Sequence, residues 1–271
     1  MVLMIRGYGL LNIKGGTVSA INHTQGSTAY GVSGKISNIN GTKIYVEGQN
    51  SIWGLYANYC IGNAKITDTE IEAYYTGTNA NYVYGIYFNG GYNATMENIR
   101  ISVNSKENIG VLRGISTLSS DYLTIKTGTI VAGQSSYSNG IDSVGVYSTH
   151  ISLGDLSTAA NTEDLVIQGE KYGVQSLGPD FKFYNGILKG VTSAYDTVRP
   201  PTELRPGYLV ETDTEEIDET TYNTAFLSQS IDDNYYLVNA KTGHETLAEA
   251  YANSNNDETI VLMKILQIQV H

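Results

Sequence analysis

An apolar motif recurs along the first half of the chain at nearly constant spacing. Each copy consists of an apolar residue, four polar or turn residues, a second apolar residue, one further residue, and a small or apolar residue. The copies are Ile13/Val18/Ala20, Ile39/Ile44/Val46, Ile66/Ile71/Ala73, Met96/Ile101/Val103 and Ile125/Ile130/Ala132. Their first residues follow one another at steps of 26, 27, 30 and 29 residues. The four-residue gaps are rich in Gly and Asn, which tolerate positive φ, so these gaps are predicted to be tight turns.

A second motif, an aromatic residue followed by Gly and an aliphatic residue, precedes the first in most copies. It occurs as Tyr8-Gly9-Leu10, Tyr30-Gly31-Val32, Trp53-Gly54-Leu55, Tyr84-Gly85-Ile86 and Tyr172-Gly173-Val174, with looser copies at Arg113-Gly114-Ile115 and Val144-Gly145-Val146. The average step is about 27 residues, a period typical of solenoids, propellers and other arrays. Each repeat holds about three short β runs, whereas a propeller blade needs four strands in about 40 residues or more. The pattern therefore predicts one coil of a β-helix per repeat.

In a β-helix, each strand pairs in parallel with its counterparts in the neighbouring coils, so equivalent residues stack at about 4.8 Å. The recurring apolar residues are then predicted to fill the interior, while the variable polar residues face water or lie in loops. The two motifs resemble the right-handed parallel β-helix of the pectin-lyase-like superfamily, and more narrowly the repetitive β-helical regions of large bacterial cell-surface proteins. The resemblance covers about residues 5–190. We therefore expect an all-β fold, a right-handed single-stranded parallel β-helix solenoid of about 6–7 coils with a small C-terminal helix-plus-strand segment.

The composition changes towards the C-terminus, and this predicts three segments. The parallel β-helix is expected over residues 1–198. Three of the four prolines then cluster at Pro200, Pro201 and Pro206, and proline interrupts both β ladders and helices. Residues 199–240 are therefore expected to be an acidic, proline-bounded connector with a short β hairpin, and residues 241–271 to hold a helix and strands.

The sequence GHETLAEAYANSN over residues 243–255 predicts the helix, with Thr242 as its N-terminal cap. The resemblance to β-helical surface proteins implies that this segment begins a further β-helix module. Strand-like runs at both ends of the sequence lead us to expect a piece of a longer protein.

Composition and charge exclude several classes of partner. The chain is 41% hydrophobic and 16% charged, with 29 Gly and 22 Tyr, which suits β structure with turns and argues against disorder. A net charge of −11 leaves no basic stripe for phosphates, so no nucleic-acid partner is expected. No run reaches the roughly 18 apolar residues of a membrane-spanning helix, so no membrane insertion is expected. Cys60 is the only cysteine, which excludes an internal disulfide framework.

The sequence predicts no catalytic residue. Hydrolases that resemble this fold carry paired aspartates, a Gly-His-Gly and an Arg-x-Lys on neighbouring coils. The nearest strings here lie beyond the prolines and do not match them: Asp232-Asp233 and Gly243-His244-Glu245. Lyases of this type need a basic proton abstractor, often beside calcium held by carboxylates. The basic residues of the repeats fall at different strand positions: Arg100, Arg113 and Lys126.

Acidic residues and histidines give no metal signature. Asp68, Glu70 and Glu72 alternate along one predicted strand and are expected to point outwards together, with Glu47 and Glu97 on adjacent coils. These carboxylates could form a calcium patch, but no calcium-loop motif is present, and a solvated acidic face is the simpler interpretation. The histidines are scattered and each is expected in a loop or at an end: His23, His150, His244 and His271. We predict no metal site and no cofactor, with Ca²⁺ left open.

The tyrosines are the strongest functional signal. Strict alternation in the aromatic–Gly–aliphatic strand places the first aromatic and the aliphatic residue on one side and the next residue on the other. Tyr56, Tyr87 and Tyr147 are therefore predicted to form an exposed ladder that could stack on sugar rings or anchor a protein partner. Stabilisation of the sheet surface is the alternative interpretation. The first aromatic residues are expected at the corner of the interior: Tyr8, Tyr30, Trp53, Tyr84 and Tyr172.

These observations support a first functional hypothesis and two alternatives. The first is a non-catalytic, adhesin-like module of a secreted or cell-surface bacterial protein, a monomer that binds a glycan or host surface or serves as a rigid spacer. The second is a polysaccharide lyase or glycoside hydrolase, which requires carboxylates, or a basic residue beside carboxylates, to converge in one groove. The third is a phage tail-spike segment, which requires trimerisation.

Overall fold

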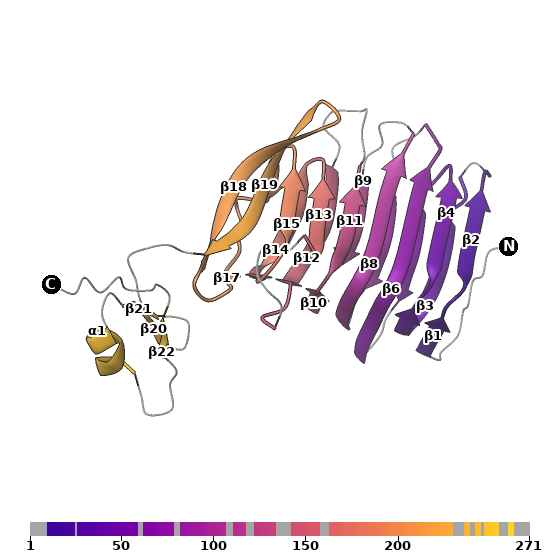
Figure 1. Ribbon diagram of the computed structural model, residues 1–271. Coiled ribbons are helices and arrows are strands. Elements are labelled where there is room, and N and C mark those ends of the chain that lie inside the picture. The colour runs from indigo at the N-terminus through magenta and orange to yellow at the C-terminus, as the bar shows by residue number, and fades with distance from the viewer. Residues whose placement is uncertain are drawn as a thin grey trace.

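The protein forms a parallel β-solenoid of about five turns, with 73% of the residues that the structure describes in strands and 3% in helix (Figure 1). This computed structural model describes residues 10–24, 26–58, 62–78, 82–106, 111–117, 122–133, 142–157, 163–229, 236–238, 242–244, 247–254 and 260–262. The predicted all-β solenoid is confirmed, and the predicted coil number is slightly too high.

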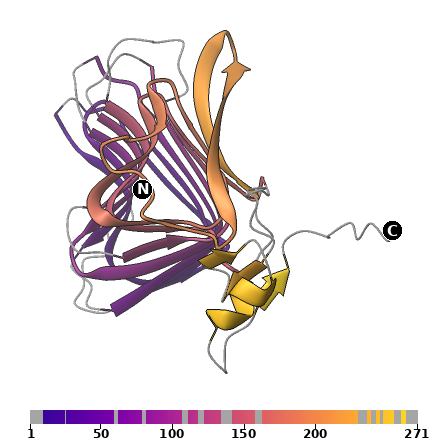
Figure 2. The same cartoon turned by 90° about the vertical axis from the view of Figure 1, so that its left-hand side faces the viewer.

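Each turn of the solenoid contributes a strand to each of three parallel sheets, which surround the core when the molecule is viewed along its axis (Figure 2). Sheet 1 contains β5 (Ile52–Asn58), β7 (Tyr82–Asn89), β9 (Val111–Thr117), β16 (Ser193–Tyr195) and the first halves of β3 (Ala29–Asn40), β12 (Asp142–Leu153) and β14 (Tyr172–Phe183). Sheet 2 contains β1 (Leu10–Lys14), β10 (Tyr122–Ile125), β17 (Glu203–Leu204), the second halves of β3, β12 and β14, and the first halves of β6 (Gly62–Tyr75) and β8 (Tyr92–Ser105). Sheet 3 contains β2 (Thr17–Asn22), β4 (Lys43–Gly48), β11 (Gly128–Ala132), β13 (Leu165–Gly169), β15 (Ile187–Gly190) and the second halves of β6 and β8.

The recurring apolar residues form continuous columns inside the solenoid. In sheet 2, the strand register aligns Ile13, Ile39, Ile66, Met96, Ile125, Leu153 and Phe183. In sheet 3, it aligns Val18, Ile44, Ile71, Ile101, Ile130, Ile167 and Leu188. Ile39, Ile66 and Met96 are completely buried. Because one coil alone cannot bury its apolar side, the spacing of the motif fixes the register between coils.

The Gly of the aromatic–Gly–aliphatic motif is required because no larger side chain fits at its position. A Cβ on Gly85 would lie 2.3 Å from Cγ2 of Ile101 and 2.6 Å from the carbonyl oxygen of Gly114 in the next coil. The equivalent glycines meet the same two obstacles, an isoleucine of sheet 3 and the next glycine of the column: Gly31, Gly54, Gly114 and Gly145. Sheets 1 and 3 therefore approach so closely at this column that no side chain fits between them.

The same glycine breaks the alternation of side chains along the strand. Pairing between β5 and β7 passes from Trp53↔Tyr84 directly to Leu55↔Ile86, and Gly54 and Leu55 are both buried. Trp53 and Tyr56 consequently lie on the same outer side, with ring centroids 6.1 Å apart. The prediction that the first aromatic residues pack inside is wrong for Tyr30, Trp53, Tyr84 and Tyr172, which are only partly buried. Tyr8 lies outside the described residues.

The acidic segment is attached to the end of the solenoid. Strands β18 (Tyr208–Ile217) and β19 (Thr220–Gln229) form an antiparallel hairpin, and β19 pairs antiparallel with β15. Lys189 of β15 makes an ion pair of 2.6 Å with Glu215 of the hairpin. The hairpin thus continues sheet 3 past its last parallel strand (Figure 1). The division of the chain at residues 198 and 240 stays a prediction.

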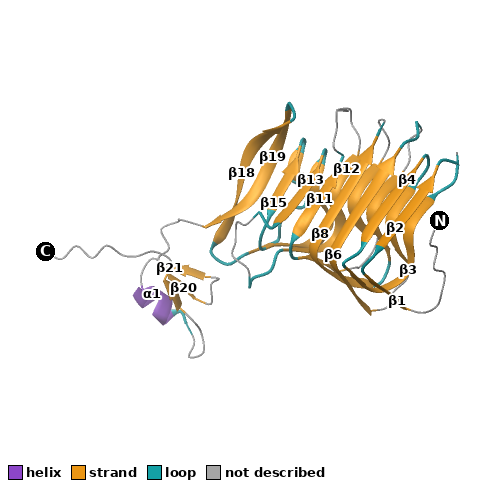
Figure 3. Cartoon of the chain, turned by 45° about the vertical axis from the view of Figure 1, so that its right-hand side comes forward, coloured by secondary structure: helices purple, strands orange, loops and turns teal. Residues whose placement is uncertain are grey.

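The described C-terminal elements are small. They comprise β20 (Tyr236–Val238), β21 (Thr242–His244), the helix α1 (Leu247–Ala252) and β22 (Ile260–Leu262) (Figure 3). The helix is shorter than predicted, because Thr242 and its two successors pair with β20 as a strand instead of capping the helix. Among the described residues, no helix is long and apolar enough to cross a membrane.

Candidate functional site

The outer side of sheet 1 carries a cluster of aromatic rings. We call it the aromatic face, and it consists of Tyr30, Trp53, Tyr56, Tyr82, Tyr84 and Tyr87. Tyr30 stacks on Trp53 with centroids 4.9 Å apart and an interplanar angle of 10°. Tyr56 stacks on Tyr87 at 5.5 Å and 11°. The rings follow the solenoid axis because their residues occupy equivalent positions in successive coils.

This stacking determines which parts of the rings a ligand can reach. Rings that stack from coil to coil cover each other's flat sides, so their edges and hydroxyl groups are what remains at the surface. Burial raises the pKa of Tyr87, and the side-chain amide of Asn89 donates a hydrogen bond of 3.1 Å to the Tyr56 hydroxyl. The indole N–H of Trp53 is buried without an acceptor in the described part of the chain. The face is therefore suited to contact through edges and hydroxyls and poorly suited to stacking on sugar rings.

Tyr147, the third residue of the predicted ladder, lies apart from the aromatic face. Ser116 occupies the position between Tyr87 and Tyr147 in the register. The guanidinium of Arg113 lies 3.4 Å from the centre of the Tyr147 ring, a cation–π contact that covers that side of the ring. The structure thus brings Tyr56 and Tyr87 together and separates Tyr147 from them. Their role in ligand binding stays a prediction.

A groove on the outer side of sheet 2 collects a second set of side chains. We call it the polar groove; it has a volume of about 300 Å³ and is lined by Tyr122, Leu123, Thr124, His150, Ile151, Ser152, Asp180, Lys182 and Tyr184. The strand register places Tyr122, His150 and Asp180 in one row across three coils. Tyr122 stacks on the His150 ring at 4.4 Å, and Nδ1 of His150 lies 3.3 Å from Oδ2 of Asp180.

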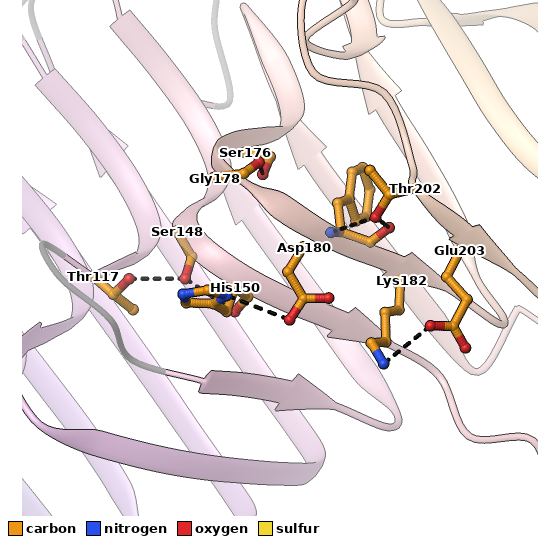
Figure 4. Close-up of polar contacts among 10 residues, drawn as sticks. Thr117, Ser148, His150, Ser176, Gly178, Asp180, Lys182, Thr202 and Glu203 are labelled. Carbon is orange, nitrogen blue, oxygen red and sulfur yellow. Dashed lines mark hydrogen bonds and ion pairs between the residues drawn. The ribbon is translucent and has the colours of Figure 1, made fainter.

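A second row runs beside the first, two residues further along each strand. It contains Thr124, Ser152, Lys182 and Glu203. Nζ of Lys182 lies 3.0 Å from Oε2 of Glu203, as Figure 4 shows together with the contact between His150 and Asp180. The Tyr184 hydroxyl also donates to Glu203. Glu203 belongs to the proline-rich segment that follows the solenoid, and through it this segment contacts two side chains that line the groove, Lys182 and Tyr184.

Two groups in the polar groove have shifted protonation equilibria. The hydrogen bond with Glu203 raises the pKa of Lys182. Burial, followed by the hydrogen bond to Glu203, raises the pKa of Tyr184. Both groups therefore keep their protons at neutral pH and act in the groove as donors.

Part of the predicted acidic face lies at the corner where the chain passes from sheet 2 to sheet 3. Asp68 has a φ of 49° and Asn98 a φ of 51°, a conformation that Asp and Asn tolerate better than most residues. The Asn98 side chain donates a hydrogen bond of 2.7 Å to Asp68. Glu70 pairs with Lys43 at 2.7 Å, and this contact lowers the pKa of Glu70. These carboxylates are thus engaged with protein groups.

A cleft of about 520 Å³ lies beside this corner, lined in part by Asp68, Glu70, Arg100 and Asp164. Within the described ranges, no group of three or more His, Cys, Asp or Glu side chains is arranged to hold a metal ion. The expectation that every histidine lies in a loop or at an end is wrong for His150, which is inside strand β12, and for His244, which is the last residue of strand β21.

His150 and Asp180 were not recognised as neighbours because they lie 30 residues apart in sequence. A signal for them exists. Tyr122, His150 and Asp180 each stand three positions before a member of the buried column Ile125, Leu153 and Phe183. Extending the apolar motif to Leu153 and Phe183 would have aligned the row.

No protein-family model matches the chain, and no match was found among curated proteins or solved structures. The functional assignment therefore depends on the residues and their geometry.

Proposed function

We propose that the chain is a non-catalytic, adhesin-like module of a secreted or cell-surface bacterial protein, in which a rigid solenoid presents a binding surface for a glycan or a host-surface molecule. The observation that supports this most directly is the aromatic face on the outside of sheet 1. Tyr and Trp are enriched in binding interfaces, and rings already held by stacking lose little side-chain entropy when a partner binds. The resemblance of the repeat motifs to the pectin-lyase-like β-helices of bacterial surface proteins supports the same assignment.

The geometry of the aromatic face suggests how it binds. Because the flat sides of the rings cover one another, a partner contacts ring edges and tyrosine hydroxyls. Such a surface suits a hydroxyl-rich glycan bound through hydrogen bonds or the polar backbone of a host protein. The solenoid itself holds the rings in a fixed row, since all of them except Tyr30 come from β5 and β7, which are hydrogen-bonded on both sides.

The experiment that tests this proposal removes the hydroxyls and keeps the rings. The double variant Tyr56→Phe/Tyr87→Phe preserves the stacking and should weaken binding to a responsive glycan or matrix protein by about thirtyfold, since each of the two lost hydrogen bonds contributes about 1 kcal/mol. Tyr122→Phe, in the polar groove, is the matched control and should bind like the wild type. Glycan arrays and immobilised matrix proteins provide the readout. If the wild type binds nothing on either panel, only the spacer function is left.

The polar groove is the surface at which the enzymatic alternative would apply. It brings His150 and Lys182 beside the carboxylates of Asp180 and Glu203, as a polysaccharide lyase or glycoside hydrolase would require. However, a proton abstractor must be unprotonated at the working pH, and the contact with Glu203 raises the pKa of Lys182. Lys182 is therefore poorly suited to abstract a proton. Release of products from pectin, alginate or glucuronan would overturn the non-catalytic assignment.

The proposed module is a monomer, whereas a phage tail-spike segment would be a trimer. Light scattering coupled to size-exclusion chromatography distinguishes the two, and a trimeric mass would favour the tail-spike hypothesis.

A further inference from the structure

Strand β18 is the last strand of sheet 3 in the described part of the chain (Figure 1). It pairs with β19 over ten consecutive residue pairs without a bulge, and no described strand pairs with its other side. Edge strands are usually short, or interrupted by a proline or a bulge, because a free edge can pair with another chain. β18 is ten residues long and contains no proline, so its backbone can accept a further strand.

The geometry of the hairpin determines which backbone groups face this free edge. Its turn consists of Asp218 and Glu219, with φ of 48° and 64°, as in the type I′ turns of two-residue hairpins. The pair that closes such a turn, Ile217↔Thr220, is hydrogen-bonded, and hydrogen-bonded and non-hydrogen-bonded pairs then alternate along the two strands. The even-numbered residues of β18 therefore direct their backbone N–H and C=O groups away from β19: Val210, Thr212, Thr214 and Glu216.

Two backbone amides agree with this assignment. The Thr214 N–H donates a hydrogen bond of 2.7 Å to Oδ1 of Asp213, and the Tyr208 N–H donates one of 3.1 Å to the carbonyl oxygen of Arg205. Amides engaged in this way take no part in the ladder between β18 and β19. A strand that binds here replaces the Asp213 carboxylate with a backbone carbonyl and leaves that carboxylate available for a cation.

The side chains along this edge carry charge of a single sign. Residues 208–229 contain no Lys, Arg or His, and their six carboxylates belong to Glu211, Asp213, Glu215, Glu216, Asp218 and Glu219. Lys189 of β15 pairs with Glu215 across β19. Within the described ranges, no ion pair involves Glu211 or Asp213, and residues 211–216 are all exposed. The edge therefore combines free backbone groups with uncompensated negative charge.

This charge disfavours a second copy of the chain and favours a basic partner. Two β18 edges side by side would bring two rows of carboxylates together, and like charges directly opposite each other destabilise a strand pair. Glu211, Asp213 and Glu215 are two residues apart and so lie on one face of the sheet. In an antiparallel strand added to β18, the residues opposite these three form non-hydrogen-bonded pairs, in which side chains approach most closely. Lys or Arg at every second position of that strand is thus placed against a carboxylate.

We propose that the free edge of β18 binds an extended, basic polypeptide segment as an additional antiparallel strand, in which Lys or Arg alternates with small or β-branched polar residues. Backbone hydrogen bonds provide the affinity in complexes formed by strand addition, and the carboxylates of β18 repel competing acidic strands. The hairpin continues sheet 3 at the end of the solenoid, whereas the aromatic face lies on sheet 1. The inference therefore does not depend on the function proposed for the aromatic face.

The probe is a short peptide of alternating Thr and Lys with blocked ends. In the proposed register, the Thr residues exchange backbone hydrogen bonds with β18, and the amides of the Lys residues point away from it. Two control peptides of the same sequence and charge carry N-methyl groups, one on the Thr amides and the other on the Lys amides. A third control replaces Lys by Glu. Binding to the full chain is measured by fluorescence anisotropy and calorimetry.

We expect the alternating peptide to bind, and the Glu peptide not to bind. Methylation of the Thr amides should weaken binding at least about tenfold, while methylation of the Lys amides should change it by less than about threefold. Equal affinities of the two methylated peptides would show attraction by charge alone and would overturn the proposal, as would failure of the alternating peptide to bind.

Variants of the protein test the same edge from the other side. Thr212→Pro removes one outward N–H at a position where an edge strand tolerates proline, and should weaken binding at least about tenfold. Glu211→Gln/Asp213→Asn removes two charges from the edge and should weaken binding about fivefold or more. The matched control, Glu72→Gln/Glu97→Gln, removes two exposed charges from β6 and β8 and should bind like the wild type. Circular dichroism establishes that each variant is folded.

Two further outcomes would contradict the proposal. If both double variants weaken binding equally, the net charge of the chain and not the edge attracts the peptide. If light scattering shows a wild-type dimer that Thr212→Pro abolishes, the occupant of the edge is a second copy. Tyr56→Phe/Tyr87→Phe leaves β18 intact and should bind the peptide like the wild type, so failure at this edge is distinguishable from failure at the aromatic face.

Discussion

The glycine column of sheet 1 provides the most direct test of the solenoid's interior packing. Gly85→Ala adds one methyl group where Cγ2 of Ile101 lies at 2.3 Å, the carbonyl oxygen of Gly114 at 2.6 Å and Cγ2 of Val103 at 3.2 Å. A normal carbon–carbon contact is about 3.5–4.0 Å. The isoleucine side chain can shift, but the carbonyl oxygen belongs to the backbone of the next coil and is held there by the sheet.

The expected cost follows from two opposing effects. Overpacking of a well-packed core costs about 1–3 kcal/mol, and occasionally more. Because the Gly114 carbonyl oxygen is a backbone atom that cannot move aside, we place the cost of Gly85→Ala at the upper end of that range. Replacing Gly by Ala also reduces the entropy of the unfolded chain, which stabilises the folded state by about 0.4–1 kcal/mol. We therefore expect a net loss of about 2 kcal/mol or more in the free energy of unfolding.

Urea unfolding measures this loss. Trp53 is the only tryptophan and lies in β5, next to the strand that carries Gly85, so its fluorescence reports on the affected sheet. The matched control is Gly48→Ala, where the nearest atoms to an added Cβ are at 3.2 and 3.3 Å, and where we expect a change within about 1 kcal/mol. If both variants unfold at the urea concentration of the wild type, the sheets do not approach each other as closely as the structure indicates.

Three further predictions concern the core, one surface carboxylate and the hairpin. Met96→Ala removes a fully buried side chain between Ile66 and Ile125 and should lower the free energy of urea unfolding by about 2–5 kcal/mol; a loss below about 1 kcal/mol would contradict the column. Hydrogen bonds from Ser157 and the contact with Lys126 lower the pKa of Asp155 to about 2, so its stabilising effect is present above the ordinary pKa of about 4 and is lost as the pH falls towards 2. Asp155→Asn should therefore reduce the fall in melting temperature between pH 5 and pH 2, and equal slopes for the two proteins would show that the contact is not stabilising. A chain ending at residue 206 leaves β15 without its antiparallel partner β19 and should self-associate with increasing concentration in light scattering, because an uncovered strand edge pairs with other chains.

The register of the core could be predicted from the sequence because it depends on spacing alone. Ile39, Ile66 and Met96 recur at 27 and 30 residues, and each variation in spacing is absorbed by a loop. The buried positions therefore align in the structure as the motif predicts. The number of turns is less well defined by the sequence, because the copies at either end depart from the motif.

The position of the first aromatic residues could not be obtained from alternation. Strict alternation assumes a regular pleat, and Gly54 interrupts it because the interior has no space for a side chain at that point. That restriction arises from Ile71 on a different sheet, so it is invisible within the strand itself. Trp53 consequently lies outside with Tyr56, and the predicted ladder has become a two-row cluster of stacked rings.

A search for repeated residue types misses the polar groove, although its first row keeps a constant spacing to the buried column. Tyr122, His150 and Asp180 belong to different chemical classes, and a search for repeated residues passes over a position whose residue changes in every coil. Their relation depends on the register of the buried residues beside them. In a solenoid, a site of this kind is found by aligning the core first and then reading the outer positions across coils.

Because residues at the outer positions vary independently of the core, one short fold can carry two separate surfaces. Each coil contributes one residue to each outer row, and the interior columns stay apolar whatever that residue is. The row of sheet 1 that begins with Tyr30, Trp53 and Tyr84 continues with Arg113 and Val144 in later coils, so the aromatic face ends where its residue type changes. On sheet 2, the polar groove occupies the later coils, and Glu203 of the proline-rich segment pairs with Lys182 in its lining. Since neither surface shares a side chain with the other, a substitution in one row alters one outer surface and leaves both the core register and the second surface in place.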